Sequence, residues 1–222
     1  MNKIVAAACG LTVFSLLSMH VHSEERSEYW RQRVSLFNRL PISSSDIVFV
    51  GNSITDGGEL TELLGDGRVK NRGINSDDID GVISRIDNIL AGQPAKLFLL
   101  IGINDVSHNL SVQSLLAKYE VLVSKIRECS PETRLYIQSV MPINNDFGRY
   151  KNLKGKEEVI VSFNSGLREL ALKNCVEYID LWEVLSVPDS GKLNPDFTND
   201  GLHLTGEGYI AWMGHIKKYV CE

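Results

Sequence analysis

Two kinds of apolar pattern alternate along the chain. Continuous apolar runs predict strands buried on both faces of a parallel sheet. They cover residues 46–50 and 96–101, and further strands are expected around Val69 and over residues 134–140 and 176–181. Between these runs, apolar residues recur every three or four positions, which predicts amphipathic helices. The alternation continues from residue 24 to residue 222 without a repeat or a low-complexity stretch. It predicts one α/β domain.

The expected helices follow from the spacing of their apolar residues. The first runs from Trp30 to Leu40 and ends at Pro41. The second has apolar positions from Ile79 to Ile89, and Ser76 can serve as its N-cap. Three more are expected over residues 115–126, 160–171 and 209–216.

In two connections, residues 142–156 and 186–198, the apolar residues follow neither a helical nor a strand period. Both exceed the roughly 2 to 6 residues that are usual in α/β units. The first follows the carboxyl end of a strand, where open α/β sheets bind ligands. We therefore expect substrate contacts from Arg149 and Tyr150, with an ordinary solvated loop as the alternative.

Residues 1–23 have the pattern of a secretory signal peptide. Lys3 carries the only charge, and the apolar run from Ile4 to Leu17 is too short to span a bilayer. Val21 and Ser23 suit a cleavage site, so the expected domain covers residues 24–222 of a secreted or periplasmic protein. We expect no stable membrane insertion after cleavage. An uncleaved anchor, or a lipidated Cys9, is the alternative.

The amino-acid composition argues against several classes of partner and cofactor. The 222 residues are 43% hydrophobic, which suffices for a core, and the net charge of −5 argues against nucleic acid as a partner. Beyond the expected signal peptide, histidine and cysteine are too scattered for a metal site, and no metal or cofactor is expected. They are His108, His203, His215, Cys129, Cys175 and Cys221. Burial of the cysteines as small apolar residues is favoured, while their pairing and the oligomeric state stay open.

Four short motifs carry candidate chemistry. They are Gly51-Asn52-Ser53-Ile54-Thr55, Arg72-Gly73-Ile74-Asn75, Gly102-Ile103-Asn104-Asp105 and Asp200-Gly201-Leu202-His203. Acyl transfer needs a nucleophile, a base, a group that orients the base, and donors for the oxyanion. Ser53 after a buried strand can be the nucleophile and His203 the base. Asp200 can orient His203 if the two share one helical turn. The Gly73 backbone N–H and the Asn104 amide can bind the oxyanion.

Each of these residues also has an ordinary interpretation. Ser53 can be a helix N-cap, and Asp200 with His203 a surface pair. Gly73 can be a turn glycine, and Asn104 can form an Asx turn. The absence of a Gly-x-Ser-x-Gly sequence argues against the ordinary α/β-hydrolase fold.

In this order, the four motifs resemble those of the SGNH hydrolase superfamily, the GDSL-type esterases and lipases. The resemblance implies a three-layer α/β/α sandwich around a parallel, flavodoxin-like sheet. It implies a catalytic triad of Ser53, Asp200 and His203, and an oxyanion hole made by the Ser53 N–H, Gly73 and Asn104. Asn52 stands where many members have aspartate.

The resemblance also suggests a substrate. Gly-Asn-Ser-Ile-Thr is similar to the first motif of members that deacetylate carbohydrates, and the loop over residues 144–152 is polar. We therefore expect a serine esterase that removes small acyl groups, O-acetyl above all, from a glycan or small-molecule ester through an acyl-enzyme. The alternatives are a lysophospholipase or thioesterase of the same superfamily, and a carbohydrate-binding relative without catalysis.

Overall fold

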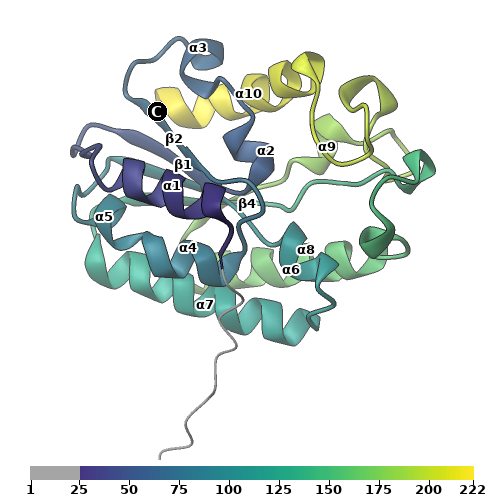
Figure 1. Cartoon of the computed structure of the whole chain (residues 1–222), viewed down its shortest axis with the longest axis horizontal. Helices are drawn as coiled ribbons and strands as arrows, with labels where there is room; N and C mark the ends of the chain where they lie inside the picture. The colour runs from purple at the N-terminus through teal and green to yellow at the C-terminus, as the bar shows by residue number, and fades with distance from the viewer. Residues whose placement is uncertain (1–25) are drawn as a thin grey trace, which may run out of the picture.

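The computed structural model describes residues 26–222 (Figure 1). The expected signal peptide, residues 1–23, lies outside the described residues. Within residues 26–222, no helix combines the length and the hydropathy that a bilayer crossing requires.

Five parallel strands form one sheet in the order β2-β1-β3-β4-β5. They are β1 (Ile47–Gly51), β2 (Val69–Gly73), β3 (Lys96–Leu100), β4 (Arg134–Gln138) and β5 (Glu177–Ile179). This order is that of the flavodoxin-like doubly wound sheet and confirms the expected α/β class. β4 is shorter than its apolar run, because the Asn164 side chain bonds both the N–H and the C=O of Val140.

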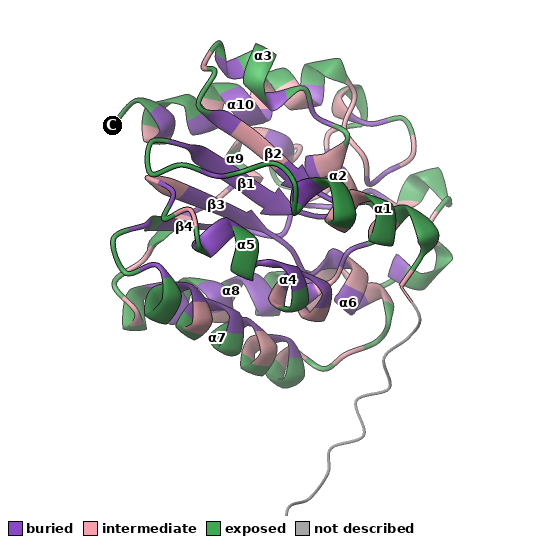
Figure 2. Ribbon diagram, turned by 60° about the vertical axis from the view of Figure 1, so that its left-hand side comes forward, coloured by how far each residue is buried: buried purple, intermediate pink, exposed green. Residues whose placement is uncertain are grey.

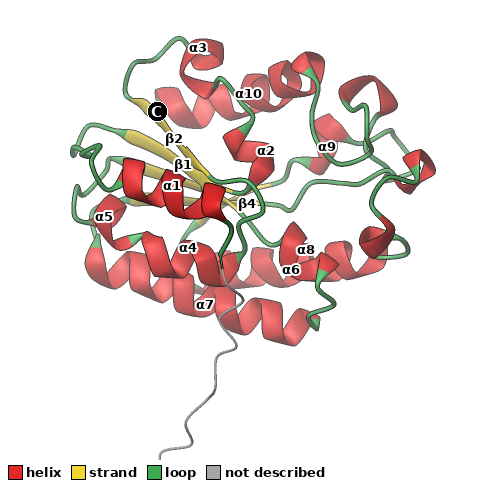
Figure 3. Ribbon diagram, viewed as in Figure 1, coloured by secondary structure: helices red, strands yellow, loops and turns green. Residues whose placement is uncertain are grey.

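Helices cover both faces of the sheet, which gives the expected three layers (Figures 1 and 3). One face carries α3 (Leu60–Leu64), α9 (Trp182–Leu185) and α10 (Gly206–Cys221). The other carries α4 (Ile79–Arg85), α5 (Asp87–Leu90), α7 (Val112–Cys129) and α8 (Glu157–Lys173). α1 (Glu28–Phe37) precedes the sheet, while the short helices α2 (Ser53–Asp56) and α6 (Ile103–Ser107) begin where β1 and β3 end.

The central strands β1 and β3 are buried on both faces, as their continuous apolar runs predict, whereas the edge strands β2 and β5 are partly exposed (Figure 2). Phe49, Phe98 and Tyr136 occupy matching register positions and stack at centroid distances of 4.6 and 4.4 Å. Tyr219 of α10 meets Tyr136 edge-on at 5.8 Å, so this aromatic row faces α10. Burying each such ring stabilises the fold by roughly 1.5–3 kcal/mol.

Three local predictions are wrong. The helix expected from Ile79 to Ile89 is divided into α4 and α5. Its N-cap is Asp78, whose carboxylate accepts the Gly81 N–H at 2.7 Å, while Ser76 lies in the preceding turn at φ 62°. The first helix ends at Phe37, before Leu40.

The cysteines also differ from expectation. Cys129, Cys175 and Cys221 are free and exposed rather than buried. They lie at the last residue of α7, in the turn before β5, and at the last residue of α10. At such ends the apolar face of an element no longer meets the core.

Candidate active site

The turn from β1 into α2 presents Ser53. The Asn52 side chain caps α2 by accepting the Ile54 N–H at 3.1 Å, which makes Ser53 the first helical residue. The Ser53 N–H has no partner within residues 26–222, as is usual for the first turn of a helix. A Cβ on Gly51 would lie 2.5 Å from the carbonyl oxygen of Leu100, so this tight turn needs glycine.

The structure brings Ser53, His203 and Asp200 together. Ser53 Oγ lies 2.8 Å from His203 Nε2, although the residues are 150 positions apart, and His203 Nδ1 lies 2.8 Å from Asp200 Oδ2. When Nδ1–H donates to the carboxylate, Nε2 is left to accept the Ser53 proton. Such an array can activate a serine hydroxyl for attack on an ester.

Asp200 and His203 meet through a bend and not through the helical turn that the spacing suggests. Asp200 Oδ1 accepts the N–H groups of Leu202 and His203 at 2.9 and 2.8 Å. Gly201 has φ 87°, and a Cβ there would lie 2.2 Å from the carbonyl oxygen of Asn144. Glycine therefore lets the chain turn back and bring the carboxylate to its own imidazole.

Asp200 is ionised at neutral pH. Its partial burial opposes the charge, but hydrogen bonds from His203, Leu202 and Tyr150 prevail and lower the pKa of Asp200 to about 2. The carboxylate can thus orient His203 and stabilise the imidazolium that forms when the serine loses its proton.

Tyr150 belongs to the same array. Its hydroxyl donates to Asp200 Oδ2 at 2.9 Å and lies 2.9 Å from His203 Nδ1. Burial and the bond to Asp200 raise the pKa of Tyr150 to about 12, so the phenol keeps its proton. Tyr150 and Arg149, the residues expected to contact substrate, both line the cavity in front of Ser53. The bond to Asp200 could not be foreseen, because no motif links a residue of this loop to Asp200.

Gly73 is not brought to that cavity. Its N–H donates to Asn71 Oδ1 at 2.8 Å, and it is absent from the cavity lining. A Cβ on Gly73 would lie 2.2 Å from the backbone nitrogen of Asp56. The glycine is thus needed where β2 packs against α2, and the structure gives no support to the expected oxyanion role.

Ser76, three residues after Gly73, lines the cavity in front of Ser53. The Asp77 N–H donates to the Ile74 carbonyl at 3.1 Å, closing a turn whose third residue, Ser76, has φ 62°. Ser76 lines the cavity, and no described residue accepts its N–H. The only sequence signal for Ser76 was its position as a polar residue shortly after β2, and such a residue equally suits a helix N-cap.

Asn104 sits in the first turn of α6 and lines the cavity. Its Nδ2 donates one hydrogen to the Asp77 carbonyl at 2.7 Å, and no described residue accepts the other. The Asp77 carboxylate in turn accepts Trp30 Nε1 at 2.8 Å and the buried Arg85 Nε at 2.7 Å. One network therefore holds both the Ser76 turn and the Asn104 amide.

The cavity in front of Ser53 is lined mostly by polar residues and measures about 550 Å³. Its aliphatic residues are Leu153 and Leu202, and no Asp or Glu lines it. The other lining residues are Ser53, Asn75, Ser76, Asn104, Ser107, Arg149, Tyr150, Lys151, Asn152 and His203. Across residues 26–222 no cluster of His, Cys, Asp and Glu suits a metal ion.

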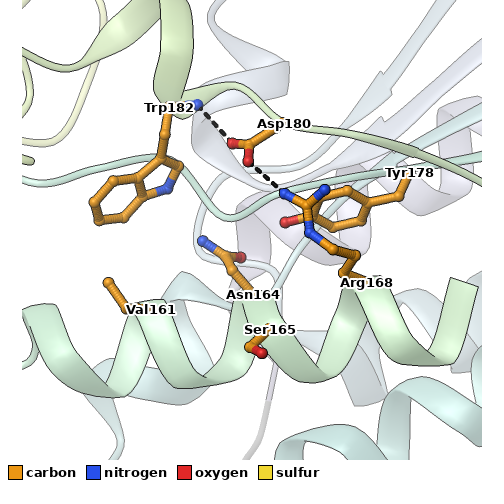
Figure 4. A pocket seen from close by; sticks show the side chains of 7 residues that line it. All are labelled: Val161, Asn164, Ser165, Arg168, Tyr178, Asp180 and Trp182. Atoms are coloured by element: carbon orange, nitrogen blue, oxygen red, sulfur yellow. Dashed lines mark hydrogen bonds and ion pairs between the residues drawn. The ribbon is translucent and has the colours of Figure 1, made fainter.

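A second pocket, of about 280 Å³, lies between α8 and the segment that follows β5 (Figure 4). Arg168 pairs with Asp180 at 2.6 Å and lies 4.6 Å from the centre of the Tyr178 ring. Ser165 is in this lining, but no histidine or cysteine is, so the pocket has no activated nucleophile.

A family model described as the GDSL-like lipase/acylhydrolase family matches residues 49–211, which is more than half of the chain. The chain belongs to the GDSL-like lipase/acylhydrolase family. It is therefore a hydrolase of the esterase type, and the resemblance of the four motifs is confirmed.

Several solved structures share the fold. A Streptococcus pneumoniae protein provisionally named a platelet activating factor is 29% identical, with a TM-score of 0.75 over 86% of this chain and 91% of that one. A provisionally named acylhydrolase from Bacteroides fragilis is 22% identical, with a TM-score of 0.76 over 89% and 98% of the two chains. An acetylxylan esterase from Geobacillus stearothermophilus is 16% identical, with a TM-score of 0.62 over 80% and 94%.

Curated relatives are longer proteins. The N-acylneuraminate cytidylyltransferase of Escherichia coli O18:K1:H7 is 29% identical over 183 residues, 80% of this chain and 41% of the relative. That of Streptococcus agalactiae serotype V is 27% identical over 145 residues, 64% and 32% of the two chains. The chain therefore spans 32 to 41% of the length of these relatives.

Proposed function

We propose that this family member is a serine esterase that hydrolyses small acyl esters, O-acetyl esters above all, on carbohydrate. The observation that carries the proposal is the array of Ser53, His203 and Asp200, which opens on a polar cavity.

In the proposed reaction, Ser53 Oγ attacks the ester carbonyl while His203 Nε2 takes its proton. His203 then returns this proton to the alcohol oxygen as the bond to the acyl carbon breaks. Water then attacks the acyl-enzyme while His203 takes its proton, and His203 gives this proton to Ser53 Oγ as the bond to the acyl carbon breaks, which releases the acid and restores the serine. Asp200 holds the imidazole in the required tautomer throughout.

Three donors are proposed for the oxyanion. They are the N–H groups of Ser53 and Ser76 and the second hydrogen of the Asn104 amide, each without a partner among the described residues. Ser76 replaces Gly73 in this role. The hydrogen-bond network around Asp77 holds the Ser76 and Asn104 donors in place, and the Asn52 cap of α2 positions the Ser53 N–H, so little reorganisation is needed when the negative charge develops.

The polar lining supports a small acyl group on a polar alcohol. A long alkyl chain would find only Leu153 and Leu202 as aliphatic surface, whereas amide and hydroxyl groups can bond sugar hydroxyls. The similarity to an acetylxylan esterase, and to enzymes named for N-acylneuraminate, agrees with a carbohydrate ester. Export by the segment 1–23 is part of the proposal and would give the enzyme access to extracellular or periplasmic glycans.

Chain-length preference tests the substrate class. We expect turnover of p-nitrophenyl acetate at a kcat/KM far above that of p-nitrophenyl palmitate, and release of acetate from acetylated glycans. A preference for the palmitate would refute the acetylesterase and favour a lysophospholipase or thioesterase.

A fluorophosphonate probe tests the nucleophile. The folded protein should be labelled at Ser53, and Ser53→Ala should lose both the label and the turnover. Ser165→Ala, which changes an exposed serine in the other pocket, is the matched control. An unlabelled, inactive wild type would instead indicate a carbohydrate binder without catalysis.

A further inference from the structure

The cavity in front of Ser53 is positively charged, although the protein is acidic. Arg149 and Lys151 line it, and no carboxylate residue does, while the chain as a whole carries −5. Asp200 is not in the cavity lining, and its carboxylate oxygens accept hydrogen bonds from Tyr150 and His203. A ligand in the cavity therefore meets two cations that no carboxylate in the lining offsets.

These cations belong to an unpaired basic segment. Residues 149–156 include four basic side chains and no acid: Arg149, Lys151, Lys154 and Lys156. Within residues 26–222 none of the four side chains forms an ion pair or a hydrogen bond. The nearby Lys192 behaves differently, because it pairs with Asp146 at 2.7 Å. Asp146 therefore pairs with Lys192, and the side chains of Arg149 and Lys151 can bind an anionic ligand.

The positions of Arg149 and Lys151 indicate that they contact the alcohol part of the ester and not its acyl group. The carbonyl carbon must lie at Ser53 Oγ, and an acetyl group fills a small part of about 550 Å³. Arg149 and Lys151 are exposed, so they form the outer part of the site, where the rest of the substrate extends. A guanidinium binds a carboxylate or a phosphate through two parallel hydrogen bonds, and an ammonium adds a point charge.

We propose that the preferred substrate is an ester whose alcohol part carries an anionic group, and that Arg149 and Lys151 bind that group. The proposal rests on the proposed esterase activity and adds the charge of the substrate to it. Asn75, Asn152 and Ser107 supply neutral donors and acceptors for the hydroxyls of the same molecule. An acidic sugar with a carboxylate, or a sugar phosphate, has this chemistry.

The test compares substrates that differ only in charge. O-Acetylated galacturonic acid and its primary amide have nearly the same shape, and the amide is neutral. At low ionic strength we expect kcat/KM for the acid to exceed that for the amide by about fivefold to tenfold, mainly through KM, and salt to reduce the ratio. A second pair, O-acetylated glucose 6-phosphate against O-acetylated glucose, shows whether a phosphate or a carboxylate is preferred.

Variants assign the effect to the two residues. In Arg149→Gln/Lys151→Gln the ratio between charged and neutral substrate should fall towards one. Lys217→Gln, which removes an exposed unpaired cation of α10, should leave the ratio unchanged. Equal kcat/KM for charged and neutral partners in the wild type, or a preference that survives the double substitution, would overturn the proposal.

Binding separates this proposal from the esterase activity. Ser53→Ala protein is titrated with galacturonic acid and with galacturonamide by calorimetry. Tighter binding of the acid supports the anion site even if no ester is turned over, in which case only the esterase proposal fails. Equal affinity for the two compounds contradicts the anion site whatever the activity.

Discussion

Asp105 should make the stability of this protein fall between pH 4 and pH 7. Its side chain is buried beside the oxyanion candidate Asn104, and its carboxylate accepts the Ile79 N–H at 3.1 Å. Burial, together with the nearby charge of Asp78, raises the pKa of Asp105 to about 7 from an ordinary value of 3.8. Lys118 opposes this shift only in part.

The direction and the size of this stability change follow from the linkage between proton binding and folding. Because the folded pKa lies above the unfolded one, the protonated carboxyl favours the folded state. Its contribution is complete below about pH 4 and is lost as the pH rises through about 7. A shift of roughly three units, at about 1.4 kcal/mol each, sets an upper bound of about 4 kcal/mol above pH 7. In a protein of this size, that corresponds to roughly 8–16 °C in Tm.

Asp105→Asn isolates this contribution. Asparagine keeps the shape and an oxygen for the Ile79 N–H but cannot ionise. The free energy of unfolding, measured by urea titration with circular dichroism, should move in favour of the variant by up to about 2.5 kcal/mol between pH 5 and pH 8, because part of the loss has already occurred at pH 5. The exposed Asp87→Asn is the control for loss of a carboxylate. A difference between Asp105→Asn and wild type that is the same at both pH values would refute the argument.

Two further substitutions test the site, and a third tests the packing of β2 against α2. Asn104→Ala removes one oxyanion donor and should lower kcat for p-nitrophenyl acetate by about 100-fold or more with little change in KM; an unchanged kcat would exclude it from the oxyanion hole. Tyr150→Phe removes one hydrogen bond to the Asp200 carboxylate and should lower kcat/KM about tenfold, since the remaining donors keep Asp200 ionised, whereas Tyr178→Phe in the other pocket should not. Gly73→Ala drives a methyl group into the backbone of α2 and should cost about 1–3 kcal/mol in urea unfolding, while Gly67→Ala, with no atom within 4 Å, should not; equal stabilities would contradict the packing role of Gly73.

Local pattern was sufficient for the architecture. A strand buried on both faces must be apolar throughout, and an amphipathic helix must repeat its apolar face, so both can be recognised without neighbours in space. The exact ends of the helices and strands could not be predicted from local pattern. β4 stops early because Asn164, from a helix later in the chain, takes the peptide groups of Val140. Ser76 was the expected N-cap of the helix that begins at Ile79, and only the turn conformation shows that Asp78 takes this position.

By itself, the sequence determined the α/β class, the family motifs and the grouping of Ser53, Asn104, Asp200 and His203, because each lies in a short motif beside a predicted element or a turn. Only the tertiary structure decided which backbone N–H faces the cavity. The Gly73 N–H is taken by Asn71, and that of Ser76 is not. Likewise, only the folded chain brings the Tyr150 hydroxyl to Asp200, fifty residues away. The physical reason is that a donor's availability depends on which acceptors the rest of the chain brings within about 3 Å, and no local pattern records that distance.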